Sequence, residues 1–202
     1  MLKTKIAVLI SGGGTNLQAL TDYQSQGKLK SGELSLVISS NENAFGLKRA
    51  EKAGIETQII KKGKAVSQLE FETKLDYLLK EKEIELIVLA GFMVILSESF
   101  VSKYKNRIIN VHPSLIPSFC GKSFYGIRVH EAALEYGVKV TGATVHYVNE
   151  IPDGGEIIYQ KAVEILPGDT AETLQKRVME QAEWELLPKA TEFASKKIRE
   201  EK

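Results

Sequence analysis

Asn110, His112 and Asp153 have side chains and a spacing that could support acyl transfer to an amine. Asn110 and His112 open the stretch Asn-Val-His-Pro-Ser-Leu-Ile-Pro, which ends at Pro117. At the end of a strand, residues i and i+2 point to the same side, so the amide and the imidazole would converge. Asp153 follows in a glycine-rich turn, Ile-Pro-Asp-Gly-Gly. An amide donor, a histidine and a carboxylate together could polarise a carbonyl and collect a proton.

A second chemical signal is the run Ser-Gly-Gly-Gly-Thr-Asn from Ser11 to Asn16, between a predicted strand and a predicted helix. Glycines permit a tight turn and the close approach of a ligand, and the N–H groups that begin a helix favour an anion. We predict a phosphate site here, with a plain structural turn as the alternative. The run is not a dinucleotide fingerprint, because Leu17 stands where the last glycine would be.

Predicted strands and helices must position these residues. Along the chain, short apolar runs alternate with helical patterns. Buried strands of a parallel sheet are predicted at residues 5–10, 33–38, 85–90 and 107–111. Helices are predicted at residues 15–24, 44–53 and 68–82. Two later strands, 141–148 and 156–163, form a predicted antiparallel hairpin around the Asp153 turn, and residues 170–197 form a closing helix. We expect one α/β domain, residues 1–202, with a mostly parallel twisted sheet and helices on both faces.

Composition argues against several other classes of protein. The 202 residues, 43% of them hydrophobic, suffice for one substantial core. With 27 Lys and Arg against 26 Asp and Glu, the chain lacks the charge of a typical nucleic-acid binder. We find no signal-peptide pattern and no apolar run near the roughly 20 residues that span a bilayer. Its single cysteine, Cys120, excludes an intrachain disulfide. We therefore expect a reduced, cytoplasmic protein with no nucleic-acid or membrane partner.

Four segments resemble, in order, the motifs of the phosphoribosylglycinamide formyltransferase family. They are Ile10 to Leu20, Leu89 to Met93, Asn110 to Pro117 and Asp153 to Ile158. The Asn-x-His-Pro-Ser motif with a later aspartate is typical of the folate-dependent formyltransferase superfamily, and the glycine-rich opening narrows the resemblance to this family. It extends from about Lys5 to Pro188. It implies a single-domain, Rossmann-like formyltransferase fold, with the phosphoribosyl loop in the N-terminal half and the folate and catalytic residues in the C-terminal half.

The resemblance implies transfer of the formyl group of 10-formyltetrahydrofolate to the amine of 5′-phosphoribosylglycinamide, a step of purine synthesis. Transfer would be direct, through a tetrahedral intermediate and without a metal. Asn110 and His112 would aim N–H donors at the oxygen that gains charge, and Asp153 would relay a proton, directly or through a water. These two small molecules are the implied partners of a monomer or homodimer.

The resemblance also implies two sets of binding residues. Those for the ribonucleotide are Gly13, Gly14, Thr15, Asn16, Pro113 and Glu183, with Glu180 as an alternative to Glu183 because the spacing from Arg177 differs by one residue from that in the family. Those for the folate are Phe92, Met93, Val94, Ile95, Leu96, Asn110 and Gly154.

The chain departs from the family in places, and some residues keep alternative interpretations. No arginine matches one that assists the substrate phosphate in some relatives; the residues near that position are Gln68, Lys61, Lys62 and Lys64. The segment Phe119 to Arg128 is a few residues longer than in common relatives. His146 is either a partner of the catalytic residues or an ordinary sheet residue. We expect His130 on a helix surface and no catalytic role for Cys120.

Two other classes of function remain open. A formyltetrahydrofolate hydrolase or a methionyl-tRNA formyltransferase would share Asn110, His112 and Asp153. Those enzymes would carry an extra N-terminal or C-terminal domain, for which we expect no room between a first strand at residue 5 and a last helix ending near 197. A non-catalytic phosphate-binding module would bind ligand without His112 and would show no turnover.

Overall fold

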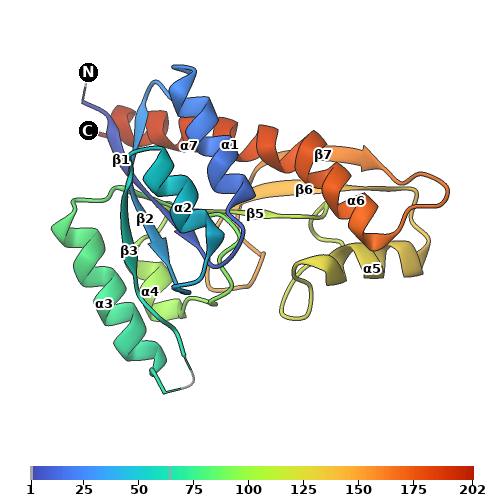
Figure 1. The fold of residues 1–202 in the computed structure, drawn as a ribbon, viewed down its shortest axis with the longest axis horizontal. Coiled ribbons are helices and arrows are strands. Elements are labelled where there is room, and N and C mark those ends of the chain that lie inside the picture. The colour runs from blue at the N-terminus through green and yellow to red at the C-terminus, as the bar shows by residue number, and fades with distance from the viewer. Residues whose placement is uncertain (1, 64) are drawn as a thin grey trace.

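The computed structural model describes residues 2–63 and 65–202. Its strands form one seven-stranded sheet (Figure 1). The strands are β1 (Thr4–Ile10), β2 (Gly32–Ser39), β3 (Glu56–Ile59), β4 (Leu86–Leu89), β5 (Ile108–His112), β6 (Val140–Tyr147) and β7 (Ile157–Glu164). Their order across the sheet is β3-β2-β1-β4-β5-β6-β7. The pairs among β1 to β5 are parallel, whereas β6 runs antiparallel to both β5 and β7. The predicted mostly parallel sheet with a C-terminal antiparallel pair is confirmed.

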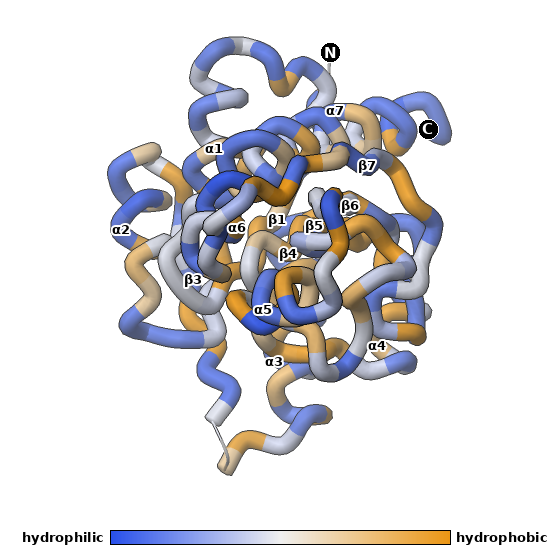
Figure 2. The backbone as a smooth tube through the Cα atoms, turned by 90° about the vertical axis from the view of Figure 1, so that its right-hand side faces the viewer, coloured by the Kyte–Doolittle hydropathy of each residue, from blue (hydrophilic) through white to orange (hydrophobic). Residues whose placement is uncertain are grey.

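Helices cover both faces of this sheet, as predicted. They are α1 (Thr15–Ser25), α2 (Phe45–Lys52), α3 (Gln68–Glu81), α4 (Glu98–Lys103), α5 (Ile127–Tyr136), α6 (Ala171–Val178) and α7 (Trp184–Glu200). Along β1, Ile6 and Val8 belong to the core shared with α1, α2, α6 and α7, whereas Ala7 and Leu9 belong to the core shared with α3 and α4. Figure 2 shows the apolar strands inside and polar residues on the outer parts of the helices.

The closing helix differs from the prediction. Instead of one helix over residues 170–197, α6 ends at Val178 and a π-helical turn, Met179–Glu183, leads into α7. A π turn contains one residue more than an α turn, so it changes the direction in which the following side chains point. This turn brings the acidic side chain of Glu183 into the interior, where it is buried.

The pattern did not predict β3, and it gave no range for α4 or α5, although a helix around His130 was expected. β3 is a four-residue strand at the edge of the sheet and is mostly exposed, so it lacks the apolar run that marks a buried strand. α4 is only six residues long, too short for a recognisable helical period. Within the described residues, none of the helices is both long and apolar enough to cross a bilayer.

Parallel pairing decides where the functional segments meet. Because β1, β4 and β5 are neighbours and run parallel, their carboxyl ends lie at one edge of the sheet, where open α/β sheets bind ligands. The glycine-rich loop follows β1, the Ala90 to Leu96 segment follows β4, and Pro113 follows β5. The link between the first two is direct, since the Met93 N–H donates to the Ser11 hydroxyl at 2.9 Å.

Candidate active site

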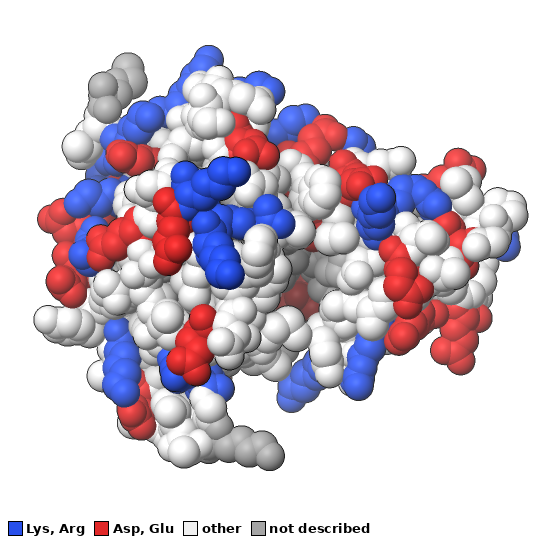
Figure 3. All heavy atoms as spheres, in the orientation of Figure 1, with Lys and Arg blue, Asp and Glu red and all other residues white. Residues whose placement is uncertain are grey.

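A cavity of about 590 Å³ opens at the carboxyl ends of these three strands. In Figure 3 the face is hollowed between the α1–α2 side and the α5–α6 side, and positive and negative side chains are interspersed around it. The predicted site residues that line the cavity are Gly13, Gly14, Thr15, Asn16, Phe92, Met93, Ile95, Asn110, His112, Pro113, Asp153 and Glu183. Residues assigned to the two substrates from segments far apart in the sequence therefore share one cavity.

Val94, Leu96 and Gly154, which were assigned to the folate, are not among the lining residues. The side chains of Val94 and Leu96 pack against the core beneath α3 and α4. Gly154 donates its N–H to the carbonyl of Ile151 in the turn after Asp153. A role for these three residues in folate binding stays a prediction, and it would rest on their main-chain groups.

The strand register brings Asn110, His112 and Asp153 together. His112 Nδ1 lies 3.5 Å from Asp153 Oδ2. Asn110 pairs across the antiparallel β5–β6 ladder with His146, and Asn110 Nδ2 lies 3.3 Å from His146 Nε2. The other nitrogen of His146 lies 2.8 Å from the Tyr147 carbonyl, so it carries a proton, and in the neutral ring Nε2 accepts from the amide. His146 Nε2 also lies 3.7 Å from Asp153 Oδ1, which is an ion pair only when the ring is charged. His146 is thus a buried partner of the set rather than an ordinary sheet residue.

The electrostatic surroundings of His112 and Asp153 favour a neutral imidazole beside an ionised carboxylate. Burial lowers the pKa of His112, and this effect exceeds the opposing influence of the Asp153 charge. Burial acts to raise the pKa of Asp153, but contacts with His146 and His112 and the N–H of Gly121 hold it below its usual value. Asp153 also has a left-handed backbone with φ of 57°, a conformation that is uncommon outside glycine and concentrates at functional sites.

The glycine-rich loop leads into an open helix end. No side chain caps the start of α1, so the N–H groups there can face an anion. A Cβ atom on Gly13 would meet nothing within 4 Å, whereas one on Gly14 would lie 2.6 Å from the Cα of Gly46. Gly14 also has φ of 72°. Packing against α2 and the tight turn therefore require glycine at 14, which leaves Gly13 with free space beside its backbone.

Glu183, rather than Glu180, reaches the cavity. Its carboxylate accepts a 2.7 Å hydrogen bond from Asn16 Nδ2, and burial raises its pKa to about 6 against the lowering effect of that bond. Glu180 lies instead 3.8 Å from Lys176 on the helix surface. Glu183 therefore lines the cavity and Glu180 does not, whereas contact of Glu183 with a ligand stays a prediction.

Gln68, Lys61 and Lys62, which are near the position of the missing arginine, do not line the cavity. Gln68 donates to Glu72 and to the Ile95 carbonyl, Lys61 pairs with Glu42, and Lys62 donates to the Val66 carbonyl. Lys64 lies outside the described residues. A cation that does line the cavity is Lys122. Lys122 was not predicted as a site residue, because the Gly-Lys-Ser run around it lacks the earlier glycine that a Walker-type phosphate loop requires; Ile116 stands there.

The predicted position of His130 was wrong, and the fold also gives the surroundings of Cys120. His130 lies on α5 but is fully buried rather than on the helix surface, and neither ring nitrogen has a hydrogen-bond partner. Burial lowers its pKa to about 4. Cys120 is partly exposed. Its pKa is raised, mainly by partial burial and to a smaller extent by the negative charge of Asp153. A raised pKa disfavours the thiolate, so Cys120 is not an activated nucleophile.

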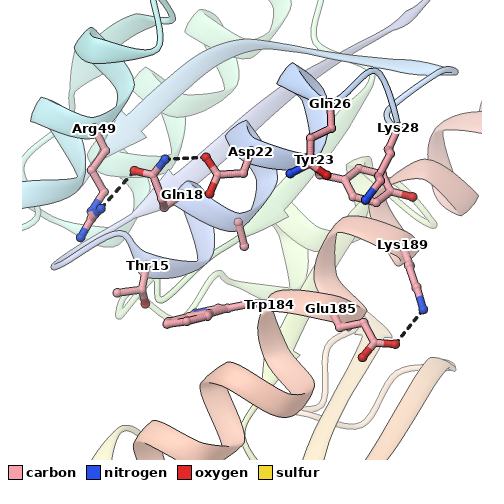
Figure 4. Close-up of a pocket in the computed structure, with 11 residues that line it drawn as sticks. Thr15, Gln18, Asp22, Tyr23, Gln26, Lys28, Arg49, Trp184, Glu185 and Lys189 are labelled. Atoms are coloured by element: carbon pink, nitrogen blue, oxygen red, sulfur yellow. Dashed lines mark hydrogen bonds and ion pairs between the residues drawn. The ribbon is translucent and has the colours of Figure 1, made fainter.

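A second cavity of about 460 Å³ lies between α1 and α7 (Figure 4). Its polar side chains are mostly bound to one another, since Gln18 contacts both Arg49 and Asp22, and Lys189 pairs with Glu185. Thr15 is shared with the first cavity, but none of the Asn110, His112 and Asp153 side chains lines the second one. The first cavity is therefore the candidate active site. Among the described residues, no group of three or more His, Cys, Asp and Glu could hold a metal ion.

Comparison with known proteins places the chain in a family. Residues 4–191 match the formyl transferase family. The trifunctional purine biosynthetic protein adenosine-3 of Gallus gallus is 47% identical over 193 residues, which cover 96% of this chain but only 18% of that protein. Phosphoribosylglycinamide formyltransferase of Haemophilus influenzae is 39% identical over 184 residues, covering 91% of this chain and 84% of that protein.

The fold agrees with this placement. The crystal structure of glycinamide ribonucleotide transformylase 1 from Symbiobacterium toebii superposes with a TM-score of 0.89 at 38% identity, over 96% of this chain and 89% of that chain. The resemblance found in the four sequence motifs is thereby confirmed. The chain belongs to the formyl transferase family and, within it, to the phosphoribosylglycinamide formyltransferases.

Proposed function

We propose that this chain transfers the formyl group of 10-formyltetrahydrofolate to the amine of 5′-phosphoribosylglycinamide. The products would be formylglycinamide ribonucleotide and tetrahydrofolate, in the synthesis of purines. The observation that carries the proposal is that the open end of α1 and the Asn110, His112 and Asp153 side chains face one cavity. A reaction between a phosphate-bearing amine and a formyl donor needs both an anion site and a polarising site in one place.

The α1 side of the cavity suits the ribonucleotide. Main-chain N–H groups of Gly13, Thr15 and Asn16 would hold its phosphate, because the helix start favours a negative charge. Glu183, across from Asn16, would accept hydrogen bonds from the ribose or from the glycinamide. Pro113, directly after β5, would lie against the substrate near the reacting amine.

The β4 side suits the flat ring system of the folate. The side chains of Phe92, Met93 and Ile95 line the cavity, and Phe92 is held from behind by stacking on Phe71 at 6.3 Å between ring centroids. Apolar walls with a few main-chain polar groups are the usual composition of sites for small heterocycles. The backbone from Val94 to Leu96 and that of Gly154 would supply the polar contacts.

The catalytic set would act on charge and protons. Attack of the amine on the formyl carbon places negative charge on the formyl oxygen, which Asn110 would stabilise with an amide N–H. The Nε2–H of the neutral His112 ring is bound to the Phe119 carbonyl, so His112 would contribute the N–H that it gains at Nδ1 on protonation. The attacking nitrogen loses one proton and the folate nitrogen gains one as its bond to carbon breaks. Asp153, ionised at neutral pH because its pKa is lowered, would accept and return the proton directly or through a water. Each such contribution is typically about 10²–10⁴ in rate.

One assay separates this proposal from its alternatives. Purified protein is mixed with 10-formyltetrahydrofolate, and the release of tetrahydrofolate is followed under three conditions: without an acceptor, with the ribonucleotide and with methionyl-tRNA. Release that requires the ribonucleotide supports the proposal, whereas release without it identifies a hydrolase. Release that requires methionyl-tRNA instead identifies the tRNA formyltransferase. Absence of release under all three conditions, with ligand still bound, supports the non-catalytic binding module.

The remaining expectations from the sequence belong to the same proposal. We propose that residues 1–202 act as one formyltransferase domain, in the cytoplasm, as a monomer or homodimer and without a nucleic-acid partner. Light scattering of the purified chain measures its mass in solution, and fractionation of the source cells tests the compartment.

A further inference from the structure

The segment that joins β5 to α5 makes two main-chain contacts, one to the side chain of His112 and one to that of Asp153. His112 Nε2 lies 2.8 Å from the carbonyl oxygen of Phe119. Two residues further on, the N–H of Gly121 donates to Asp153 Oδ2 at 2.9 Å. One short stretch of backbone therefore contacts both side chains, although it lies outside the Asn-x-His-Pro-Ser motif.

The Phe119 carbonyl decides which nitrogen of His112 carries a proton. A carbonyl oxygen can only accept a hydrogen bond, so Nε2 must be the protonated nitrogen in the neutral ring. Nδ1 then faces Asp153 Oδ2 at 3.5 Å, a separation longer than a good hydrogen bond. His112 lines the cavity, and this arrangement directs the nitrogen that can gain or lose a proton toward Asp153.

The carbonyl of Phe119 is held in place by an unusual backbone and by aromatic packing. Phe119 has φ of 49°, in the left-handed region that residues with a Cβ atom seldom adopt. Its ring packs edge-to-face on Phe124, with 6.2 Å between centroids, and on Tyr136 of α5, with 5.9 Å. Residues in such conformations persist where their surroundings impose them, and they cluster at functional sites.

We propose that Phe119 is a positioning residue for His112. The contacts of the Phe119 ring with Phe124 and Tyr136 hold the Phe119 carbonyl on the Nε2 proton of His112. Through Gly121, the same stretch also holds the Asp153 carboxylate. This proposal adds a positioning residue to the proposed formyl transfer. It rests on that proposed function only for the expected change in kcat. The orientation of His112 can be measured in the free protein, whatever reaction the protein catalyses.

Nuclear magnetic resonance of the histidine rings tests the orientation directly. The chain has three histidines, so the ring signals of His112 can be assigned by substitution of the other two. In the native protein we expect the Nε2–H tautomer. Phe119→Gly removes the ring but leaves a residue that tolerates a positive φ, and we expect it to release His112 into a mixture of tautomers.

The pKa of His112 should fall further in Phe119→Gly. The Phe119 carbonyl raises this pKa against the larger lowering effect of burial, so loss of the contact removes a stabilising acceptor for the charged ring. The other titratable groups around His112, which are Asp153, His146 and His130, are unchanged in the variant. A native tautomer and an unshifted pKa in Phe119→Gly would overturn the proposal, as would a native His112 without the Nε2–H tautomer.

Kinetics supply the second measurement, with two matched variants. Phe119 does not line the cavity, so Phe119→Gly should lower kcat by about 10- to 10²-fold while KM for the ribonucleotide stays within about twofold. Phe119→Tyr keeps the ring and should remain close to the native kcat. Cys120→Ala removes only the neighbouring contact to the Pro117 carbonyl and should also remain close to native.

The outcomes separate a positioning role from general damage to the segment. Equal losses of kcat in Cys120→Ala and Phe119→Gly, at matched melting temperatures, would contradict a specific role for Phe119. If the native protein shows no formyl transfer, the proposed function fails, while the tautomer of His112 in Phe119→Gly still decides the role of Phe119.

Discussion

The side-chain amide of Asn16 donates a 2.7 Å hydrogen bond to the carboxylate of Glu183, and so joins the first helix to the π turn near the end of the chain. Glu183 is the buried acid of this pair, and its pKa is raised to about 6. A carboxylate held in the interior costs stability when it is ionised, unless its partners compensate fully. The pair therefore links the proposed ribonucleotide contact to the stability of the fold.

Glu183→Gln should stabilise the protein at pH 8 and weaken ribonucleotide binding. Folding raises this pKa from 4.5 to about 6, so the native protein loses stability as the pH rises through this range, by about 2 kcal/mol in total. Glutamine removes that penalty but cannot replace the charge. Urea unfolding at pH 8 and pH 4 measures the effect. The same difference between variant and native protein at both pH values would contradict the burial of a titrating carboxyl.

Asp153→Asn should lower kcat by at least about 10²-fold and leave folate binding nearly intact, because the amide keeps the shape but cannot accept a proton. Steady-state kinetics and folate titration measure the two effects. Glu150→Gln is the matched control, since Glu150 is an exposed carboxylate in the same loop. Near-native turnover in Asp153→Asn would remove this residue from the mechanism.

Asn110→Ala should lower kcat by about 10²–10³-fold, the usual effect of losing one donor to a developing oxyanion. His146→Asn should have a smaller effect, because His146 would act mainly through the Asn110 amide at 3.3 Å, which is closer than its 3.7 Å contact with Asp153. Since the two residues form one unit, the double variant should be no slower than Asn110→Ala. Additive losses in this cycle would show that His146 has a separate role.

Gly13→Ala and Gly14→Ala should have different consequences although the residues are adjacent. Gly14→Ala combines a positive φ with a close contact to Gly46, so it should lower the free energy of unfolding by about 1–3 kcal/mol. Gly13→Ala has room for its methyl group and should fold normally, but it should raise KM for the ribonucleotide more than for the folate. Equal increases of both KM values in Gly13→Ala would argue against a phosphate at this loop.

His130 should make the protein sensitive to acid. Its pKa is lowered from 6.5 to about 4, so the folded state resists protonation that the unfolded chain accepts. Its contribution to stability is intact above pH 6.5 and is lost as the pH falls toward 4, by about 3 kcal/mol. His130→Leu should flatten this part of the pH profile in urea unfolding, whereas Tyr136→Leu on the same helix should not. An unchanged slope in His130→Leu would contradict this prediction.

The strands and most helices could be predicted because burial on both faces leaves a strong pattern. Ile6 to Ile10 are all fully buried, and such runs read as strands of a covered parallel sheet. β3 has no such pattern, because an edge strand exposes most of its residues. The motifs also predicted which residues would meet, since Asn110 and His112 lie two apart on a strand that ends at the ligand-binding edge.

The contacts around these residues could not be predicted in the same way. The pairing of Asn110 with His146 depends on the register of β5 and β6, and the contact of Phe119 with His112 depends on the path of a loop. The burial of His130 depends on which face of α5 packs inward. Each of these is decided by tertiary packing, which local patterns do not record.

The π turn at Met179–Glu183 makes the site depend on the exact number of residues in this part of the chain. An α-helix advances about 100° per residue, so deletion of a single residue from the turn would leave two ordinary helices but rotate Glu183 away from Asn16. At this site the length of the helix matters as much as the identity of its side chains. In a helix without the π turn, the residue at the position of Glu183 would point in another direction. Insertions and deletions inside a helix, usually discarded as noise, can here report a change in what the protein binds.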